Sequence, residues 1–218
     1  MDEIRPMVGV LMLRLGRNFD GGYVVPQLAL KECDVLISLG YGYDSSFERE
    51  FLKLNRKKSV DLYDSNINIQ SSVERLFLDL RSVIFRGRGF PVFRSKQLLE
   101  YLVVLFNQRI NCKVGKIGHI NDSKCLNLVD TLKASAYKKI ILKMDIEGAE
   151  MDALLGSIKM LSERSIDMIL LEVEPYRLEA FKHTGLEIYD FLSNLGYTAF
   201  CSILNDKIFK ITDKNISD

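Results

Sequence analysis

Short apolar runs that end directly before glycine or aspartate constrain the fold of this chain more than any other feature. Three such runs cover residues 35–39, 60–63 and 140–144. Apolar runs of this length, bounded by turn residues, are typical of strands buried on both faces of a parallel sheet. Helix-period segments separate the runs, and this alternation predicts an α/β fold.

The remaining segments complete this arrangement. We expect helices at residues 47–54, 127–136, 149–161 and 178–195, and further strands at 113–117 and 168–171. Residues 198–203 and 207–211 read as an antiparallel hairpin, and residues 66–110 as a largely helical insert after the second strand. The 218 residues contain no repeat or linker, so we expect one domain over residues 1–218 with a mostly parallel central sheet.

Composition narrows the class of protein. The net charge is +1, so no overall field draws the chain to nucleic acid or to an anionic membrane. No apolar run approaches the ~20 residues that span a bilayer. The four cysteines form no C-x-x-C pair, which favours scattered thiols over a zinc or disulfide role. These features together predict a cytoplasmic protein.

Glycine and acidic residues stand where the predicted parallel strands end. Gly40 and Gly42 follow the first strand, and Asp64 follows the second after the roughly 20-residue gap of a nucleoside-binding unit. Ligands of open α/β sheets bind beyond these strand ends. We therefore predict that Gly40, Gly42 and Asp64 bind a nucleoside cofactor, together with Asp44 and Ser45 of the first turn.

The nature of the nucleoside follows from charge. A dinucleotide fingerprint needs a third glycine where this chain has Ser45, and Asp44 would repel a pyrophosphate. S-adenosylmethionine (SAM) has no phosphate, and its ammonium and sulfonium groups are cationic, so acidic strand ends suit it. An NAD-dependent oxidoreductase and a non-catalytic nucleoside-binding subunit remain as alternatives.

A dense acidic segment follows the strand at residues 140–144. Asp145, Glu147 and Glu150 lie within six positions at a strand-to-helix junction. Acidic residues near a helix N-terminus interact favourably with its dipole, which accounts for Glu150 and in part for Glu147. Asp145 ends a buried run, where an ionised carboxylate is costly without a partner or a task.

These residues resemble the FkbM-type SAM-dependent methyltransferases. The segment 143–150, KMDIEGAE, looks like the K-[IM]-D-[IV]-E-G-A-E motif of that family. Two further blocks, R-L-G with D-G-G-Y-V at 14–24 and S-L-G-Y-G-Y-D-S-S-F-E at 38–48, resemble a bacterial subgroup. The resemblance implies a Rossmann-like class I methyltransferase fold, SAM as methyl donor, and O-methylation of sugars, surface-glycan precursors or small metabolites.

The resemblance also implies roles for single residues. Gly40, Gly42 and Asp64 would line the SAM pocket, with Asp145 beside the transferring methyl group. The first block adds Asp20, Gly22 and Tyr23 to the cofactor-binding set, although Tyr23 reads equally well as a packing residue.

One departure from the family pattern concerns the strand after the acidic motif. Many members have E-x-H there, and this chain has Glu172-Val173-Glu174. We therefore expect that Glu174 takes the place of that histidine near the acceptor or that the role falls to another residue.

An alcohol acceptor must lose a proton, so a base is needed within about 3 Å. Our candidates are Asp145, Glu147 and His119, in that order. A divalent ion held by Asp145, Glu147 and Glu172 is an alternative that we do not adopt. Arg86 and Arg88, in a Gly-rich basic connector, form either a solvated loop or a site for a phosphorylated acceptor.

Overall fold

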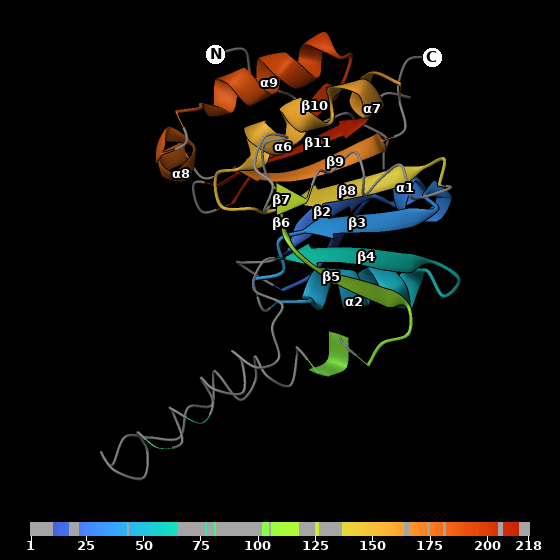
Figure 1. The fold of residues 1–218 in the computed structure, drawn as a ribbon. Helices are drawn as coiled ribbons and strands as arrows, with labels where there is room; N and C mark the ends of the chain where they lie inside the picture. Colours follow the sequence, from blue (N-terminus) through green and yellow to red (C-terminus); the bar gives the residue numbers. More distant parts are fainter. Residues whose placement is uncertain are drawn as a thin grey trace.

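The computed structural model describes residues 11–17, 22–42, 44–64, 77, 81, 102–104, 106–117, 125–126, 137–163, 166–173, 175–180, 182–204 and 207–213. A seven-stranded sheet in the order β10-β11-β9-β8-β3-β4-β5 forms its centre (Figure 1). The strands are β3 (Val35–Leu39), β4 (Ser59–Asp64), β5 (Ile110–Val114), β8 (Ile140–Met144), β9 (Ile166–Val173), β10 (Thr198–Leu204) and β11 (Lys207–Asp213).

Five neighbouring strands, from β5 to β9 across the sheet, are parallel. β11 runs antiparallel to both of its neighbours, β9 and β10. The strand order reverses beside β3, which pairs with β4 on one side and with β8 on the other. The expected mostly parallel, Rossmann-like sheet and its antiparallel C-terminal hairpin are confirmed.

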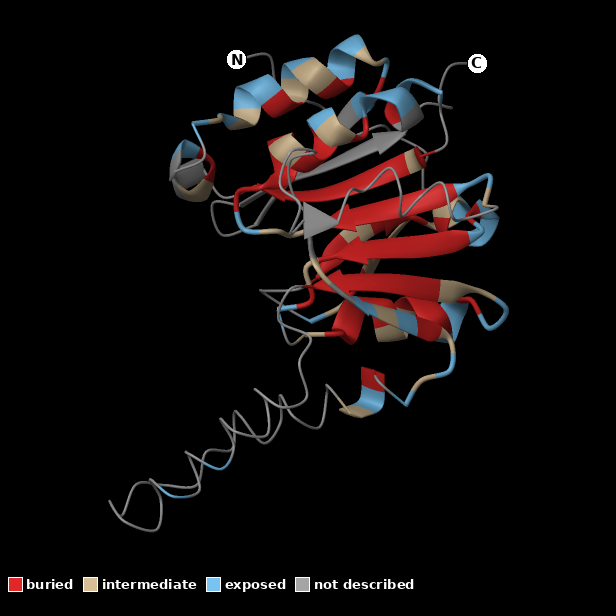
Figure 2. Ribbon diagram, viewed as in Figure 1, coloured by how far each residue is buried: buried red, intermediate tan, exposed pale blue. Residues whose placement is uncertain are grey.

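Helices and a hairpin cover the two faces of the sheet. One face packs against α6 (Glu150–Gly156), α7 (Ile158–Ser162), α8 (Pro175–Ala180) and α9 (Gly185–Asn194). The other packs against β1 (Met12–Leu15), β2 (Tyr23–Pro26), α1 (Gln27–Glu32) and α2 (Ser46–Leu54). Every residue of β3 and β8 is buried, as Figure 2 shows in red, which explains why all but one residue of each strand is apolar.

Two predicted helices are each divided in the structure. The expected helix at 149–161 breaks at Ser157, whose hydroxyl donates to the Ala153 carbonyl at 2.7 Å and competes with the helical backbone bonds. The expected helix at 178–195 breaks before Thr184, which begins α9 with a reciprocal capping box to Glu187. Lys182, at φ 61°, lies between the two halves.

Other boundaries also differ from the prediction. β5 (Ile110–Val114) begins at Ile110 rather than at residue 113. After Gly115, β6 (Lys116–Ile117) pairs separately with β7 (Cys125–Leu126). The β1–β2 hairpin and α1 were not predicted. The expected helix at 127–136 and most of the insert at 66–110 lie outside the described residues. Within the described part of the chain, no helix is long and apolar enough to cross a membrane.

Candidate functional site

The turn after β3 is built from two glycines with positive φ, 83° at Gly40 and 53° at Gly42. The Gly40 amide donates to the Tyr63 carbonyl at 2.9 Å. A side chain at Gly40 would collide with the backbone carbonyl of Asp145, so only glycine lets these two strand ends approach so closely. Gly42 is exposed, and the space where its side chain would lie is open.

Asp64, at the end of β4, holds this turn through hydrogen bonds. Its Oδ2 atom accepts hydrogen bonds from the backbone amides of Tyr41 at 2.6 Å and Gly42 at 3.3 Å, and the residue is buried. On the other side, the Asp145 amide donates to the Leu39 carbonyl at 2.9 Å. The structure therefore brings the glycine turn, Asp64 and Asp145 together at the carboxyl ends of β3, β4 and β8.

The residues after the turn organise the start of α2. Asp44 Oδ1 accepts the amide of Ser46 at 2.9 Å, and its Oδ2 lies 3.5 Å from Arg17 Nε. Ser45 is the N-cap residue of α2 and is fully buried. An acidic side chain thus stands at the helix end where a dinucleotide would need its pyrophosphate.

The segment after β8 forms a tight loop around Glu150. The Glu150 Oε1 atom accepts the amides of Ile146 at 3.1 Å and Gly148 at 3.2 Å, and the residue is buried. Glu147, at φ 62°, is exposed and forms an ion pair with Arg177 of α8. Asp145 is partly exposed at the beginning of this loop. The two candidate bases therefore have different surroundings.

Tyr23 and Gly22 lie inside the protein rather than on an open surface. The Tyr23 hydroxyl donates to Glu172 Oε2 at 3.0 Å, and its ring meets Phe47 edge-on at 5.2 Å. A side chain at Gly22 would collide with the backbone of Arg17. The placement of Tyr23 matches the packing alternative that the sequence left open, and contacts of both residues with SAM stay predictions.

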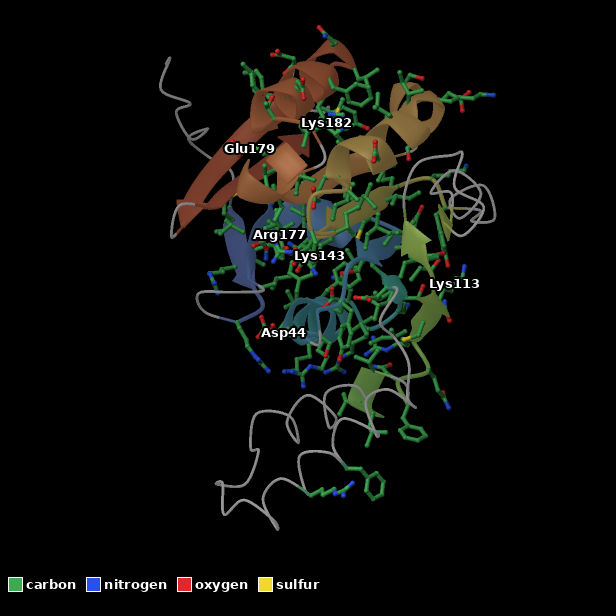
Figure 3. The ribbon with its side chains drawn as sticks, turned by 60° about the vertical axis from the view of Figure 1, so that its left-hand side comes forward. Asp44, Lys113, Lys143, Arg177, Glu179 and Lys182 are labelled. Carbon is green, nitrogen blue, oxygen red and sulfur yellow. The ribbon has the colours of Figure 1, made fainter. Side chains whose placement is uncertain are left out.

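A buried charged cluster lies under the glycine turn. Its charged pair, Lys143 and Glu48, was not predicted as part of the site. Lys143 Nζ is 3.3 Å from Glu48 Oε1, and both side chains are almost completely buried. Ser38 Oγ donates to the same Glu48 oxygen at 2.6 Å. In Figure 3 Lys143 lies in the middle of the molecule, inward of Asp44. A lysine within the apolar run at 140–144 was the signal that could have revealed the cluster.

Burial and nearby charges shift the pKa values of two residues of this cluster, Tyr23 and Lys143. The pKa of Tyr23 is raised well above its ordinary value, first by burial and then by the nearby carboxylates of Asp145, Glu172 and Glu48. Burial lowers the pKa of Lys143, but the same three carboxylates outweigh it and raise the pKa overall. Tyr23 and Lys143 therefore share three acidic neighbours.

Several predicted site residues lie outside the described part of the chain. These residues are Asp20, Arg86, Arg88, His119 and Glu174. Among the residues that the structure describes, no group of three His, Cys, Asp or Glu side chains is arranged to hold a metal ion. Cys33 and Cys112 are free thiols.

Comparison with solved structures finds methyltransferases at low identity. They include an O-methyltransferase family protein from Burkholderia thailandensis (10% identity, 85% of this chain, 52% of that chain, TM-score 0.48). A precorrin-6y C5,15-methyltransferase from Geobacter metallireducens is also similar (13% identity, 85% of this chain, 83% of that chain, TM-score 0.45). So is human N-acetylserotonin methyltransferase in complex with SAM (11% identity, 86% of this chain, 49% of that chain, TM-score 0.43). The chain thus spans about half of the first and third of these proteins, and the fold assignment rests on the strand order itself.

Sequence comparison finds a match to one family model in the second half of the chain. None of the curated protein sequences matches this chain. The model of the methyltransferase FkbM domain matches residues 119–199, which include β8, the Asp145–Glu150 loop and β9. The match covers the acidic half of the strand-end site, and it agrees with the motif resemblance at 143–150. Residues 119–199 of this chain are therefore similar to the FkbM domain of methyltransferases.

Proposed function

We propose that this protein transfers the methyl group of SAM to an oxygen of a sugar, a surface-glycan precursor or a phosphorylated small molecule. The observation that carries the proposal is the junction of the glycine turn, Asp64 and Asp145. Asp64 Oδ2 holds the amides of Tyr41 and Gly42, and Gly40 packs on the Asp145 backbone. Ligands of open α/β sheets bind at this kind of strand-end junction.

The residues at this junction fit the chemistry of SAM. Gly42 leaves open space beside the turn for a nucleoside, and the Asp64 carboxylate is the acceptor proposed for the ribose hydroxyls. When bound, SAM supplies a methyl group on a positively charged sulfur. The acidic side chains of Asp145, Glu172 and Glu48 near the turn suit such a cation.

Asp145 is the proposed general base for the acceptor hydroxyl. It is partly exposed and lies at the junction, so an acceptor oxygen can approach it. Glu147 ranks behind it because its carboxylate is already paired with Arg177. His119 remains a candidate on the sequence alone.

The acceptor class rests on the family resemblance and on charged residues of the sequence. Arg86 and Arg88 would bind an acceptor phosphate, and Glu174 would face the acceptor. O-methylation within surface polysaccharide formation is the pathway class that this resemblance suggests. The proposal keeps the expected cytoplasmic location, with which the free thiols of Cys33 and Cys112 agree.

An NAD-dependent oxidoreductase is the weaker alternative. The start of α2 already holds the Asp44 carboxylate, which accepts the Ser46 amide that a pyrophosphate would need. A cofactor with two phosphates would therefore meet a fixed negative charge.

Calorimetric titration with SAM, S-adenosylhomocysteine (SAH) and NAD tests the cofactor. We expect SAM and SAH to bind at one site and NAD to give no heat. Incubation with methyl-labelled SAM and a panel of sugars, sugar nucleotides and phosphorylated metabolites then tests the acceptor. Binding of NAD without SAM would refute the proposal, and binding of SAM with no labelled product from any panel would favour the non-catalytic subunit.

A further inference from the structure

Residues from all three sequence blocks that resemble the family meet in one buried cluster. Tyr23 comes from the first block, Ser38 and Glu48 from the second, and Lys143 from the third. The Lys143 ammonium lies 3.3 Å from Glu48 Oε1 and 5.3 Å from the centre of the Tyr23 ring. Glu172 joins through the Tyr23 hydroxyl. The cluster therefore links β2, α2, β3, β8 and β9 beneath the strand-end site.

Lys143 connects the cluster to the glycine turn. Lys143 Nζ donates to the carbonyl oxygen of Gly40 at 3.4 Å. Gly40 is also held by the hydrogen bond that its amide donates to the Tyr63 carbonyl and by its packing against the Asp145 backbone. Lys143 thus supports the turn from inside the protein, while Asp64 holds its outer amides.

Stability alone does not account for a charged pair at this place. Burying two charges costs desolvation energy that their attraction often fails to recover, and apolar replacements of such pairs are commonly neutral or stabilising. The pair is also imperfect, because among the described residues no group donates to Glu48 Oε2. A cost of this kind points to a task other than holding the sheet together.

We propose that Lys143, held by Glu48, is a positioning residue that sets the carbonyl of Gly40 and thereby the shape of the glycine turn that receives the cofactor. This inference rests on the proposed function, since it assigns the turn to SAM. It gives Lys143 no contact with the reacting atoms. Glu48 acts only through Lys143, so its effect on the turn disappears when Lys143 is removed.

The first test separates positioning from stability. Lys143→Met leaves Glu48 uncompensated and should lower Tm by about 10 °C. The double variant Lys143→Met/Glu48→Gln removes both charges, keeps an acceptor for Ser38, and should recover most of that loss. Both variants should bind SAH about tenfold more weakly than the wild type. SAH affinity of the double variant within twofold of the wild type would overturn the proposal.

The matched control is Tyr197→Phe. Tyr197 is buried and donates to the Ile166 carbonyl at 2.8 Å, at the opposite end of β9 from the site. Losing this bond should lower Tm without changing SAH affinity. An equal loss of affinity in this variant would show that affinity follows general stability rather than the position of the turn.

The second test needs no cofactor. Amide hydrogen exchange, followed by NMR, reports on the Tyr41 and Gly42 amides that donate to Asp64. In the double variant these amides should exchange at least about tenfold faster than in the wild type, whereas in Tyr197→Phe their rates should be unchanged. Unchanged exchange in the double variant would refute the positioning role. A wild type that binds neither SAM nor SAH would instead refute the proposed function, and the exchange rates would still decide the role of Lys143.

Discussion

The amide of Tyr41 donates a 2.6 Å hydrogen bond to Asp64 Oδ2, and this bond joins the turn after β3 to the end of β4. The same oxygen accepts the Gly42 amide at 3.3 Å. One buried carboxylate therefore shapes the turn and also stands where the ribose of the cofactor is proposed to bind. Replacing Asp64 should therefore change both the turn and the binding of the cofactor.

Asp64→Ala is expected to weaken SAM and SAH binding by roughly 10- to 100-fold, because hydrogen bonds to a charged group contribute about 1.5–3 kcal/mol each. Calorimetric titration measures the effect. Asp61→Asn is the matched control, since Asp61 lies on the same strand, is buried, and accepts from Asn111 at 2.8 Å away from the turn. Equal losses in the two variants would argue against a specific role of Asp64.

Gly40→Ala is expected to lower the free energy of unfolding by at least about 2 kcal/mol more than Gly196→Ala. Both residues have positive φ, 83° and 80°, so both substitutions carry similar backbone strain. Only at Gly40 does the added methyl group collide with the Asp145 carbonyl, whereas the space beside Gly196 is open. Urea unfolding of the two variants gives the difference, and equal values would contradict the close packing of β3 on β8.

Asp145→Asn is expected to lower kcat for methyl transfer by roughly 10²- to 10⁴-fold, the usual contribution of a general base. Glu147→Gln should lower it by less than about tenfold, because Glu147 is exposed and paired with Arg177. SAH affinity, measured alongside, should change little in Glu147→Gln. If Glu147→Gln or His119→Ala proved the more damaging variant, the base would be reassigned to that residue.

Alkylation of Cys112 should be slow and strongly dependent on pH. Burial raises the pKa of this thiol from 9.0 to about 11, so at pH 8 the reactive thiolate is about 100-fold rarer than in the unfolded chain. The rate, followed by mass spectrometry of the Cys112 peptide, should rise about tenfold per pH unit from pH 8 towards the pKa. The same peptide in urea is the control, and equal rates in the two states would contradict the burial of this thiol.

Sequence patterns located the central strands well because burial on both faces leaves an unmistakable apolar run. β3, β4 and β8 lie within one residue of their expected positions. The predicted bounds of β5 were displaced because its sequence, INCKV, alternates and is less apolar than those of β3 and β8. The division between α8 and α9 was missed although Thr184 and Glu187 form a recognisable capping box, since the apolar spacing continues across it.

For the site, the residues at strand ends were predictable and the buried partners were not. Parallel topology alone brings Gly40, Asp64 and Asp145 to one edge. The pairing of Lys143 with Glu48 depends on how α2 packs against the sheet, which no local pattern specifies. The same holds for the ion pair between Glu147 and Arg177, whose members come from different loops and helices.

The insertion of β11 between β9 and β10 has a consequence for synthesis on the ribosome. On the side away from β8, β9 pairs with β11, and residues 207–213 of β11 leave the ribosome after β10. Until then one edge of a hydrophobic strand stays open and can pair with another nascent chain. We therefore expect the chain to be most prone to aggregation before residues 207–213 have left the ribosome and paired with β9.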